Sequence, residues 1–226
     1  MQFTVFWEER KYKMTKVKIC CINSIAEAKM AMSYGASAIG LVGRMPSGPG
    51  PIEDELIKSI AITIPPPIAT FLLTCETSVE QIINHHQRTF TNTIQLVDEL
   101  HEKEYALIKK ALPAIKLVQV IHVIDEGSVE QAIKVSQYVD AILLDSGNPK
   151  LTIKELGGTG RIHDWKLSRK IKESINIPLF LAGGLNAENV RQAIDVVNPY
   201  GVDVCSGVRT NGQLDENKLK AFFEKV

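Results

Sequence analysis

The feature that most constrains the fold is a strict alternation along the chain. Apolar, β-branched runs take turns with amphipathic helical stretches, eight times over. Strands buried on both faces consist of near-continuous apolar residues, and their regular alternation with helices is typical of a parallel sheet. The expected strands are Val17–Cys21, Ser37–Val42, Ile68–Leu73, Thr93–Val97, Ala114–Val123, Asp140–Asp145, Pro178–Ala182 and Val202–Ser206. The expected helices are Ser24–Tyr34, Glu53–Ile62, Ser78–Gln87, Glu102–Leu112, Ser128–Val139, Trp165–Ser174, Ala187–Val197 and Glu216–Lys225.

Three of these helices begin with the spacing of a capping box. In this motif a hydroxyl binds a backbone N–H three residues on, and an acid or amide side chain there returns the bond. The pairs are Ser24 with Glu27, Thr77 with Glu80, and Ser128 with Gln131.

Eight strand–helix units predict a (βα)8 TIM barrel of the α/β class, and 226 residues suit a single barrel. An open doubly wound sheet is the alternative. We expect one domain, because no low-complexity tract or linker rich in proline, glycine and serine divides the chain. The predicted barrel occupies residues 17–226. Residues 1–16 are an N-terminal extension or an early start, with Met14 as a possible first residue.

Charge and cysteine usage narrow the function classes. Lys and Arg number 26 and Asp and Glu number 26, so no basic field would hold nucleic acid or an acidic membrane. No apolar run approaches the ~20 residues of a membrane span. A small anion is compatible with this balance, because loop amides bind phosphate without net charge. The cysteines match no zinc spacing, which predicts no metal site and favours a reducing cytoplasm. They are Cys20, Cys21, Cys75 and Cys205.

Cys20 ends the first apolar strand, and active sites of barrels lie at the C-terminal ends of the strands. A thiolate there could act as a general base. An ordinary thiol has a pKa near ~8.5, so a working base needs a lowered pKa. Lys18 points to the same side of the strand two residues earlier and could lower it. The plainer interpretation is that Cys20 is a small buried packing residue.

Asp145 ends the apolar run of the sixth strand. A carboxyl group in that position is costly unless it is hydrogen-bonded or faces a site. Partial burial would raise its pKa and make it a usable general acid. A carboxylate that caps a helix or anchors a loop is the other interpretation.

Glycines gather in the loops that follow the last three strands. Gly183 and Gly184 follow strand seven, and Ser206 and Gly207 follow strand eight. In barrels these two loops often form one phosphate site, because backbone N–H groups can approach an anion where no Cβ intervenes. Simple tight turns are the alternative.

The segment after strand six, residues 146–162, is long for a connection in a barrel. Long loops of this kind are often functional lids. Gly158 and Gly160 leave it little side-chain bulk, so it could fold over a ligand. A surface connector is the plainer interpretation.

In combination these segments resemble the phosphoribosylanthranilate isomerase family of tryptophan biosynthesis, from about Val17 to the C-terminus. The matching segments are Val17-Lys18-Ile19-Cys20, Leu143-Leu144-Asp145, Gly157-Gly158-Thr159-Gly160 with Asp164-Trp165, Leu181-Ala182-Gly183-Gly184-Leu185 with Glu188-Asn189-Val190, and Tyr200-Gly201-Val202-Asp203-Val204 with Ser206-Gly207-Val208.

The resemblance implies a barrel enzyme that needs no cofactor. Its reaction is an Amadori rearrangement, which turns an N-(5-phosphoribosyl) amine into a 1-amino-1-deoxyribulose 5-phosphate. By this resemblance Cys20 takes the proton from C2 of the sugar, and Asp145 protonates the ring oxygen. The glycines of the last two loops hold the 5-phosphate.

The chain departs from the family pattern in several loops. After strand one the family has Gly-Ile-Thr-Arg, where this chain has Cys21-Ile22-Asn23-Ser24. After strand two the family has an arginine that meets the anthranilate carboxylate. Here Arg44 is displaced from that place and is the nearest substitute. The family's Gln-Leu-His-Gly is Gln95-Leu96-Val97-Asp98, and Arg209 replaces an acid.

These departures leave two other functions open. The first is a barrel isomerase that acts on a different phosphorylated sugar or amine. The second is a non-catalytic phosphosugar-binding or regulatory protein, which the presence of both Cys20 and Asp145 disfavours. The expected partner is a small phosphorylated sugar, and the expected oligomeric state is a monomer or homodimer.

Overall fold

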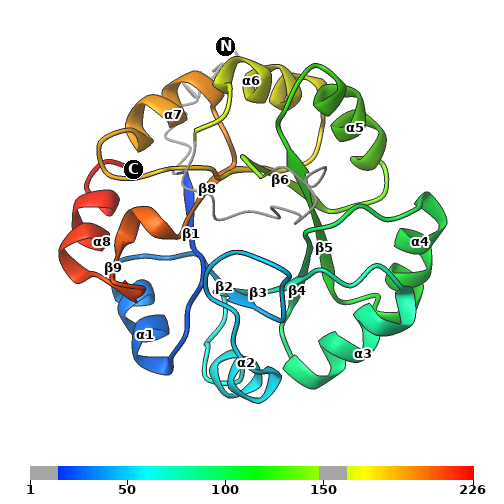
Figure 1. The fold of residues 1–226 in the computed structure, drawn as a ribbon, viewed down its shortest axis with the longest axis horizontal. Helices are drawn as coiled ribbons and strands as arrows, with labels where there is room; N and C mark the ends of the chain where they lie inside the picture. Colours follow the sequence, from blue (N-terminus) through cyan, green and yellow to red (C-terminus); the bar gives the residue numbers. More distant parts are fainter. Residues whose placement is uncertain (1–14, 148–161) are drawn as a thin grey trace, which may run out of the picture.

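A computed structural model of the chain describes residues 15–147 and 162–226. Within them, eight strands form a closed barrel in the order of the sequence, and the helices surround it (Figure 1). Every neighbouring pair is parallel, including β8 with β1. The prediction of a TIM barrel is therefore confirmed, and the open sheet is excluded.

The barrel strands are β1 (Lys16–Ile19), β2 (Ala38–Val42), β3 (Ala69–Thr74), β4 (Thr93–Leu96), β5 (Lys116–His122), β6 (Ala141–Asp145), β7 (Leu179–Leu181) and β8 (Gly201–Val204). The helices are α1 (Ile25–Ser33), α2 (Asp54–Ala61), α3 (Val79–Thr89), α4 (Glu102–Ala111), α5 (Gly127–Val135), α6 (Trp165–Ser174), α7 (Val190–Val197) and α8 (Glu216–Phe223). After β8 come a short 3-10 helix, η1 (Ser206–Val208), and a small hairpin of β9 (Arg209–Thr210) and β10 (Gln213–Leu214).

The core has two layers because side chains alternate across each strand. In β2, Ile39 and Leu41 belong to the layer between strands and helices, whereas Ala38 and Val42 belong to the layer inside the barrel. All residues of β2 are buried, which explains why its sequence is continuously apolar.

Strand β1 ends at Ile19, two residues before the predicted end. Cys21 has a φ of 61°, in the left-handed region, and cannot continue an extended strand. Cys20 and Cys21 therefore begin the loop at the C-terminal end of the barrel.

Two predicted helix starts are wrong because nearby polar side chains form other bonds. Ser128 lies inside α5, where its hydroxyl donates to the carbonyl of His122 and accepts from the N–H of Ile124. Before α7, the side chain of Asn186 accepts from the N–H groups of Glu188 and Asn189, so a turn precedes the helix.

The N-terminal cap of α3 lies one residue after the predicted one. The cap of α1 forms one of its two predicted hydrogen bonds. The cap of α3 is Ser78, not Thr77. Ser24 does accept from the N–H of Glu27, as predicted for α1. The Glu27 carboxylate, however, accepts from Asn23 and not from the capping residue.

Strand β1 starts at Lys16, and the division into residues 1–16 and 17–226 stays a prediction. In the part of the chain that the structure describes, no helix is long and apolar enough to cross a bilayer.

Candidate active site

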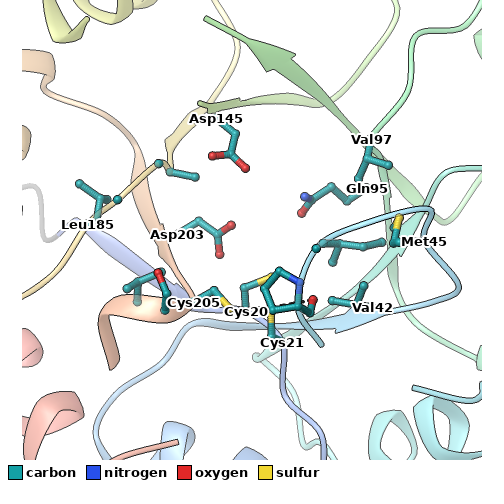
Figure 2. A pocket seen from close by; sticks show the side chains of 18 of the residues that line it. Cys20, Cys21, Val42, Met45, Gln95, Val97, Asp145, Leu185, Asp203 and Cys205 are labelled. Carbon is teal, nitrogen blue, oxygen red and sulfur yellow. Dashed lines mark hydrogen bonds between the residues drawn. The ribbon is translucent and has the colours of Figure 1, made fainter. Parts of the chain in front are cut away.

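A cavity of about 710 Å³, open to solvent, lies at the C-terminal ends of the strands. Two sides of the cavity differ in the kind of residue that lines them. One side has apolar side chains from β2, β3 and the end of β4, namely Val42, Leu73 and Val97, while the loops after β7 and β8 supply the other. Figure 2 shows Val42 and Val97 across the cavity from Leu185 and Cys205.

Cys20 and Asp145, the two residues expected to act as base and acid, both line this cavity. Cys20 follows β1, whereas Asp145 is the last residue of β6. Figure 2 shows the two side chains on different sides of the same space, with room between them.

Beneath Cys20 lies a buried ion pair. Lys18 Nζ donates to Asp203 Oδ1 at 2.9 Å, and the two residues are direct partners in the register of β1 and β8. They are 0% and 7% exposed. Burial alone would lower the pKa of Lys18, but the charge of Asp203, with smaller effects of Cys20 and Cys21, raises it. Lys18 is therefore a permanent cation inside the barrel.

Gly40 in β2 makes room for the thiol and the ammonium group. A Cβ on this residue would lie 2.8 Å from Cys20 Sγ and 3.0 Å from Lys18 Nζ. Cys20 and Lys18 therefore share one pocket of the interior, as the two-residue spacing predicts.

The pKa of the Cys20 thiol lies below its ordinary value. The largest cause is the hydrogen bond with the neighbouring Cys21 thiol; burial opposes it, and the positive charge of Lys18 lowers the pKa further. The lowered pKa increases the thiolate fraction, and the thiolate is the form that can accept a proton.

Two further thiols lie at the same wall and were expected only to pack. The thiol of Cys205 donates to Cys21 Sγ at 2.6 Å, and both residues line the cavity. Hydrogen bonds with Cys20 and Cys205, together with burial, raise the pKa of Cys21 well above its ordinary value. Cys20 therefore ionises more readily than Cys21.

Asp145 is fixed at the end of its strand by local contacts. Its Oδ1 accepts from the N–H of Ser146 at 2.7 Å. The carboxyl group is partly exposed and reaches the cavity, so it is accessible to a ligand.

The loop after β7 offers bare backbone to the cavity. Gly183 and Gly184 have φ values of 85° and 64°, which favour glycine, and both line the cavity. Asn189 Nδ2 donates to the carbonyl of Gly184 and so holds this loop in place. Ser206, from the loop after β8, completes this side.

Gly207 lies behind this wall and is not one of the described residues that line the cavity. A Cβ on Gly207 would lie 1.9 Å from the carbonyl oxygen of Leu185. Glycine at this position therefore lets the loops after β7 and β8 pack against each other. Gly158 and Gly160 lie outside the described residues.

Arg44, the expected partner of a carboxylate, is exposed in the loop after β2 and is not among the described residues that line the cavity. Arg44 directly precedes Met45, and Met45 lines the cavity. Its carbonyl accepts from the Cys75 thiol, so Cys75 anchors this loop. Among residues 15–147 and 162–226, no lysine or arginine side chain lines the cavity.

Gln95 is a lining residue that the sequence did not single out. It is a polar side chain within β4, where the pattern predicts only a buried strand. His122 does not line this cavity; it borders another one nearby, and burial lowers its pKa. In the described part of the chain, no group of three His, Cys, Asp or Glu residues could hold a metal ion.

A second buried ion pair supports the loop after β1. Arg209 donates to both oxygens of Glu27, at 3.0 Å and 2.9 Å, and also to the carbonyl of Cys21 at 2.6 Å. Arg209 thus ties the loop that carries the thiols to the start of β9.

The comparisons agree with this geometry. The family model described as N-(5'phosphoribosyl)anthranilate (PRA) isomerase matches residues 17–225. The chain is 37% identical over 213 residues to N-(5'-phosphoribosyl)anthranilate isomerase 2 of Methanosarcina mazei, and the match covers 93% of each chain.

Solved structures give the same result. Phosphoribosyl anthranilate isomerase from Thermotoga maritima has a TM-score of 0.80 and 31% identity, with 94% of this chain and 98% of that chain covered. Another, described in complex with reduced 1-(o-carboxyphenylamino)-1-deoxyribulose 5-phosphate, has a TM-score of 0.78 and 30% identity, with the same coverage. The chain therefore belongs to the N-(5'-phosphoribosyl)anthranilate isomerase family.

Proposed function

We propose that Cys20 is the general base and Asp145 the general acid of an Amadori rearrangement. The activity is that of the family, an isomerisation in tryptophan biosynthesis. The observation that carries the assignment is that a thiol with a lowered pKa and an accessible carboxyl group border one cavity from different strands.

In the proposed reaction Asp145 protonates the ring oxygen of the phosphoribosyl amine, and the bond from this oxygen to C1 breaks. The Cys20 thiolate then takes the proton from C2, which gives an enolamine that tautomerises to the ketose. No atom is gained or lost. Each proton transfer by a positioned side chain contributes roughly 10²–10⁴-fold.

We place the 5-phosphate at the loops after β7 and β8, beside Gly183, Gly184, Ser206 and Gly207. Support comes from the two glycines with positive φ that line the cavity and from the tight packing of the two loops. Gly158 and Gly160 would contribute from the loop after β6. Binding at this end orients the sugar between Cys20 and Asp145 without contact at the reacting bond.

The apolar wall of Val42, Leu73 and Val97 suits the aromatic ring of the amine. Arg44, at the rim beside this wall, is the proposed long-range partner of its carboxylate. Replacement of Arg44 by alanine should weaken substrates with a carboxylated ring more than it weakens ribose phosphate. Equal losses for both would remove Arg44 from recognition.

A second candidate function is isomerisation of another phosphorylated sugar or amine. The observation that favours it is that no basic side chain of the described residues lines the cavity. An unpaired carboxylate in an apolar pocket binds poorly.

The decisive experiment is rescue of a tryptophan auxotroph that lacks this isomerase, together with turnover by the purified protein. Cys20→Ala and Asp145→Ala should each lose about 10²–10⁴-fold in turnover. The matched control is Cys75→Ser, which removes a thiol that does not line the cavity and keeps a donor for the carbonyl of Arg44. Wild-type turnover in either active-site variant would reject the assigned roles. Binding of a phosphosugar without rescue would favour the second candidate or a non-catalytic role.

For the assembly and compartment we infer a monomer or homodimer in the cytoplasm. One similar structure is described as mutually generated monomers of a dimeric isomerase from Thermotoga maritima, so relatives of this fold exist in both states. The four free cysteines suit a reducing compartment. Light scattering of the purified protein distinguishes the two assemblies.

A further inference from the structure

Strand β4 places a buried amide at the apolar wall of the cavity. Gln95 is 3% exposed, and its Oε1 has no hydrogen-bond partner among the described residues. Figure 2 shows the amide pointing into the cavity, on the side opposite Asp203 and Asp145. A buried polar atom without a partner is unfavourable, so its position at the cavity suggests a partner that arrives with the ligand.

Gln119 on the adjacent strand β5 is a useful comparison, because protein groups form all the hydrogen bonds of its amide. Its Oε1 accepts from the hydroxyl of Tyr105. Its Nε2 donates to the carbonyls of Leu96, Asp98 and Val120. Both ends of the Gln119 amide are thus satisfied by the protein, whereas the carbonyl end of Gln95 is not.

The neighbours of Gln95 cannot supply the missing bond. In the register of the sheet it lies beside Leu73 of β3 and Val118 of β5, which are both apolar. Around it the wall consists of Val42, Leu73 and Val97. Gln95 is therefore a buried polar side chain on the wall that suits an aromatic ring.

We propose that Gln95 is a specificity-determining residue that binds the amine part of the substrate. This inference rests on the proposed function. A primary amide offers a carbonyl acceptor and an N–H donor side by side. An aromatic amine with an ortho carboxylate presents the complementary pair, an N–H and an anionic oxygen. Recognition by a neutral amide fits a wall on which the described residues include no basic side chain.

The position of Gln95 relative to the proposed acid, Asp145, and the proposed base, Cys20, supports this assignment. The sugar lies between Cys20 and Asp145 in the proposed pose, and the phosphate lies at the glycine loops after β7 and β8. The amine then extends toward β2, β3 and β4, which is the side that carries Gln95. Gln95 thus contacts the part of the substrate that distinguishes it from a simple pentose phosphate.

The test compares two ligands on the intact protein by calorimetry. One is reduced 1-(o-carboxyphenylamino)-1-deoxyribulose 5-phosphate, which carries the aromatic amine, and the other is ribulose 5-phosphate, which does not. Gln95→Leu should weaken the first ligand by about 10- to 100-fold, the range for a hydrogen bond to a charged group, and the second by less than about 3-fold. Gln95→Glu should weaken the first ligand still more, because it adds a like charge.

The matched control is Gln87→Leu, which changes an exposed glutamine on α3. Thermal unfolding without ligand is the second readout. Gln95→Leu should be at least as stable as the wild type, because it removes a buried atom without a partner; a structural glutamine would lose stability instead.

Equal weakening of both ligands, or weakening of neither, overturns the assignment of Gln95 to the amine. Failure of the wild type to bind the aromatic analogue, with ribulose 5-phosphate bound, overturns the proposed function itself. The two failures are therefore distinguishable.

Discussion

Lys18 Nζ lies 2.9 Å from Asp203 Oδ1, and Asp203 lines the same cavity as Cys20. The carboxylate keeps the ammonium group charged, and the ammonium group in turn lowers the pKa of the thiol. The ion pair thus connects β8 to the ionisation of a residue at the end of β1.

Replacement of Lys18 by methionine should raise the pKa of Cys20, because it removes a positive charge that favours the thiolate. The acidic limb of the pH–rate profile should then move to higher pH, and turnover at neutral pH should fall about 10-fold for each unit of the shift. The rate of alkylation of Cys20 by iodoacetamide, measured against pH, reports the same change.

The control for this experiment is Lys16→Met, which removes an exposed charge from the same strand. Loss of Lys18 leaves Asp203 buried without a partner, at a cost of about 3–5 kcal/mol. The double variant Lys18→Met with Asp203→Asn avoids this cost. Because the charge of Asp203 raises the pKa of Cys20, its reference is Asp203→Asn alone, and the double variant should have the higher Cys20 pKa of the two. An unchanged pH midpoint in folded Lys18→Met, or equal midpoints in the double variant and Asp203→Asn, would contradict the role of Lys18.

The pair of Glu27 and Arg209 should contribute stability that depends on pH. Burial alone would raise the pKa of Glu27, but hydrogen bonds from Arg209 and from the N–H of Leu214 lower it below its ordinary value of 4.5. A carboxyl group with a lowered folded-state pKa stabilises the protein above its unfolded pKa. Urea unfolding should therefore show a loss of stability as the pH falls below about 4.5, and Glu27→Gln should flatten this dependence.

Removal of Arg209 alone should be more harmful than removal of the whole pair. Arg209→Met leaves the buried Glu27 carboxylate without its counter-charge and should cost about 3–5 kcal/mol. The double variant Arg209→Met with Glu27→Met should recover much of this loss. A double variant that is no more stable than Arg209→Met would show that the ion pair is not the reason for the loss.

Oxidation should form a disulfide bond between Cys21 and Cys205. Their sulfur atoms are 2.6 Å apart, and both thiols border the cavity. Diamide takes up the two thiol hydrogens and leaves a disulfide. We expect reversible loss of turnover that dithiothreitol restores, and a linked peptide pair in mass spectrometry. Cys205→Ser should retain its own untreated rate after diamide; an equal loss in this variant would assign the inactivation to another thiol.

Gly207→Ala should disturb the end of the cavity that is proposed to hold the phosphate. The new Cβ would lie 1.9 Å from the carbonyl oxygen of Leu185, so the loops after β7 and β8 must separate. We expect about 1–3 kcal/mol of destabilisation and weaker binding of ribulose 5-phosphate. Gly212→Asn is the control, because its surroundings are open and asparagine tolerates its φ of 80°. Unchanged phosphosugar affinity would remove the packing of these loops from the proposed site.

The fold was predictable because a strand that is buried on both faces has an apolar residue at nearly every position. Strands such as β2 are apolar throughout, which both a closed barrel and an open doubly wound sheet require, and the pairing of β1 with β8 decides for the barrel. The ends of elements were less predictable. Strand β1 stops where Cys21 takes a left-handed φ, and α7 starts late because Asn186 forms a turn, and neither event follows from periodicity.

The candidate site was partly predictable for the same reason. Strand ends identified Cys20 and Asp145, because a polar or reactive side chain there interrupts an apolar run. Gln95 matches a family residue but received no role from the sequence, since only its neighbours on β3 and β5 show that its Oε1 lacks a partner. Cys205 and Arg209 meet their partners only through closure of the barrel, from residues more than 180 positions away in the chain.

The pairing of β1 with β8 also sets the order in which the candidate site can form during synthesis. Lys18 leaves the ribosome 185 residues before Asp203, and Glu27 leaves it 182 residues before Arg209. Until the final strand is made, Lys18 therefore lacks its carboxylate partner, and the loop that carries Cys20 lacks the contact with Arg209. A nascent chain or a fragment that ends before β8 holds the Cys20 thiol on a loop that does not yet have these ties to the last part of the barrel.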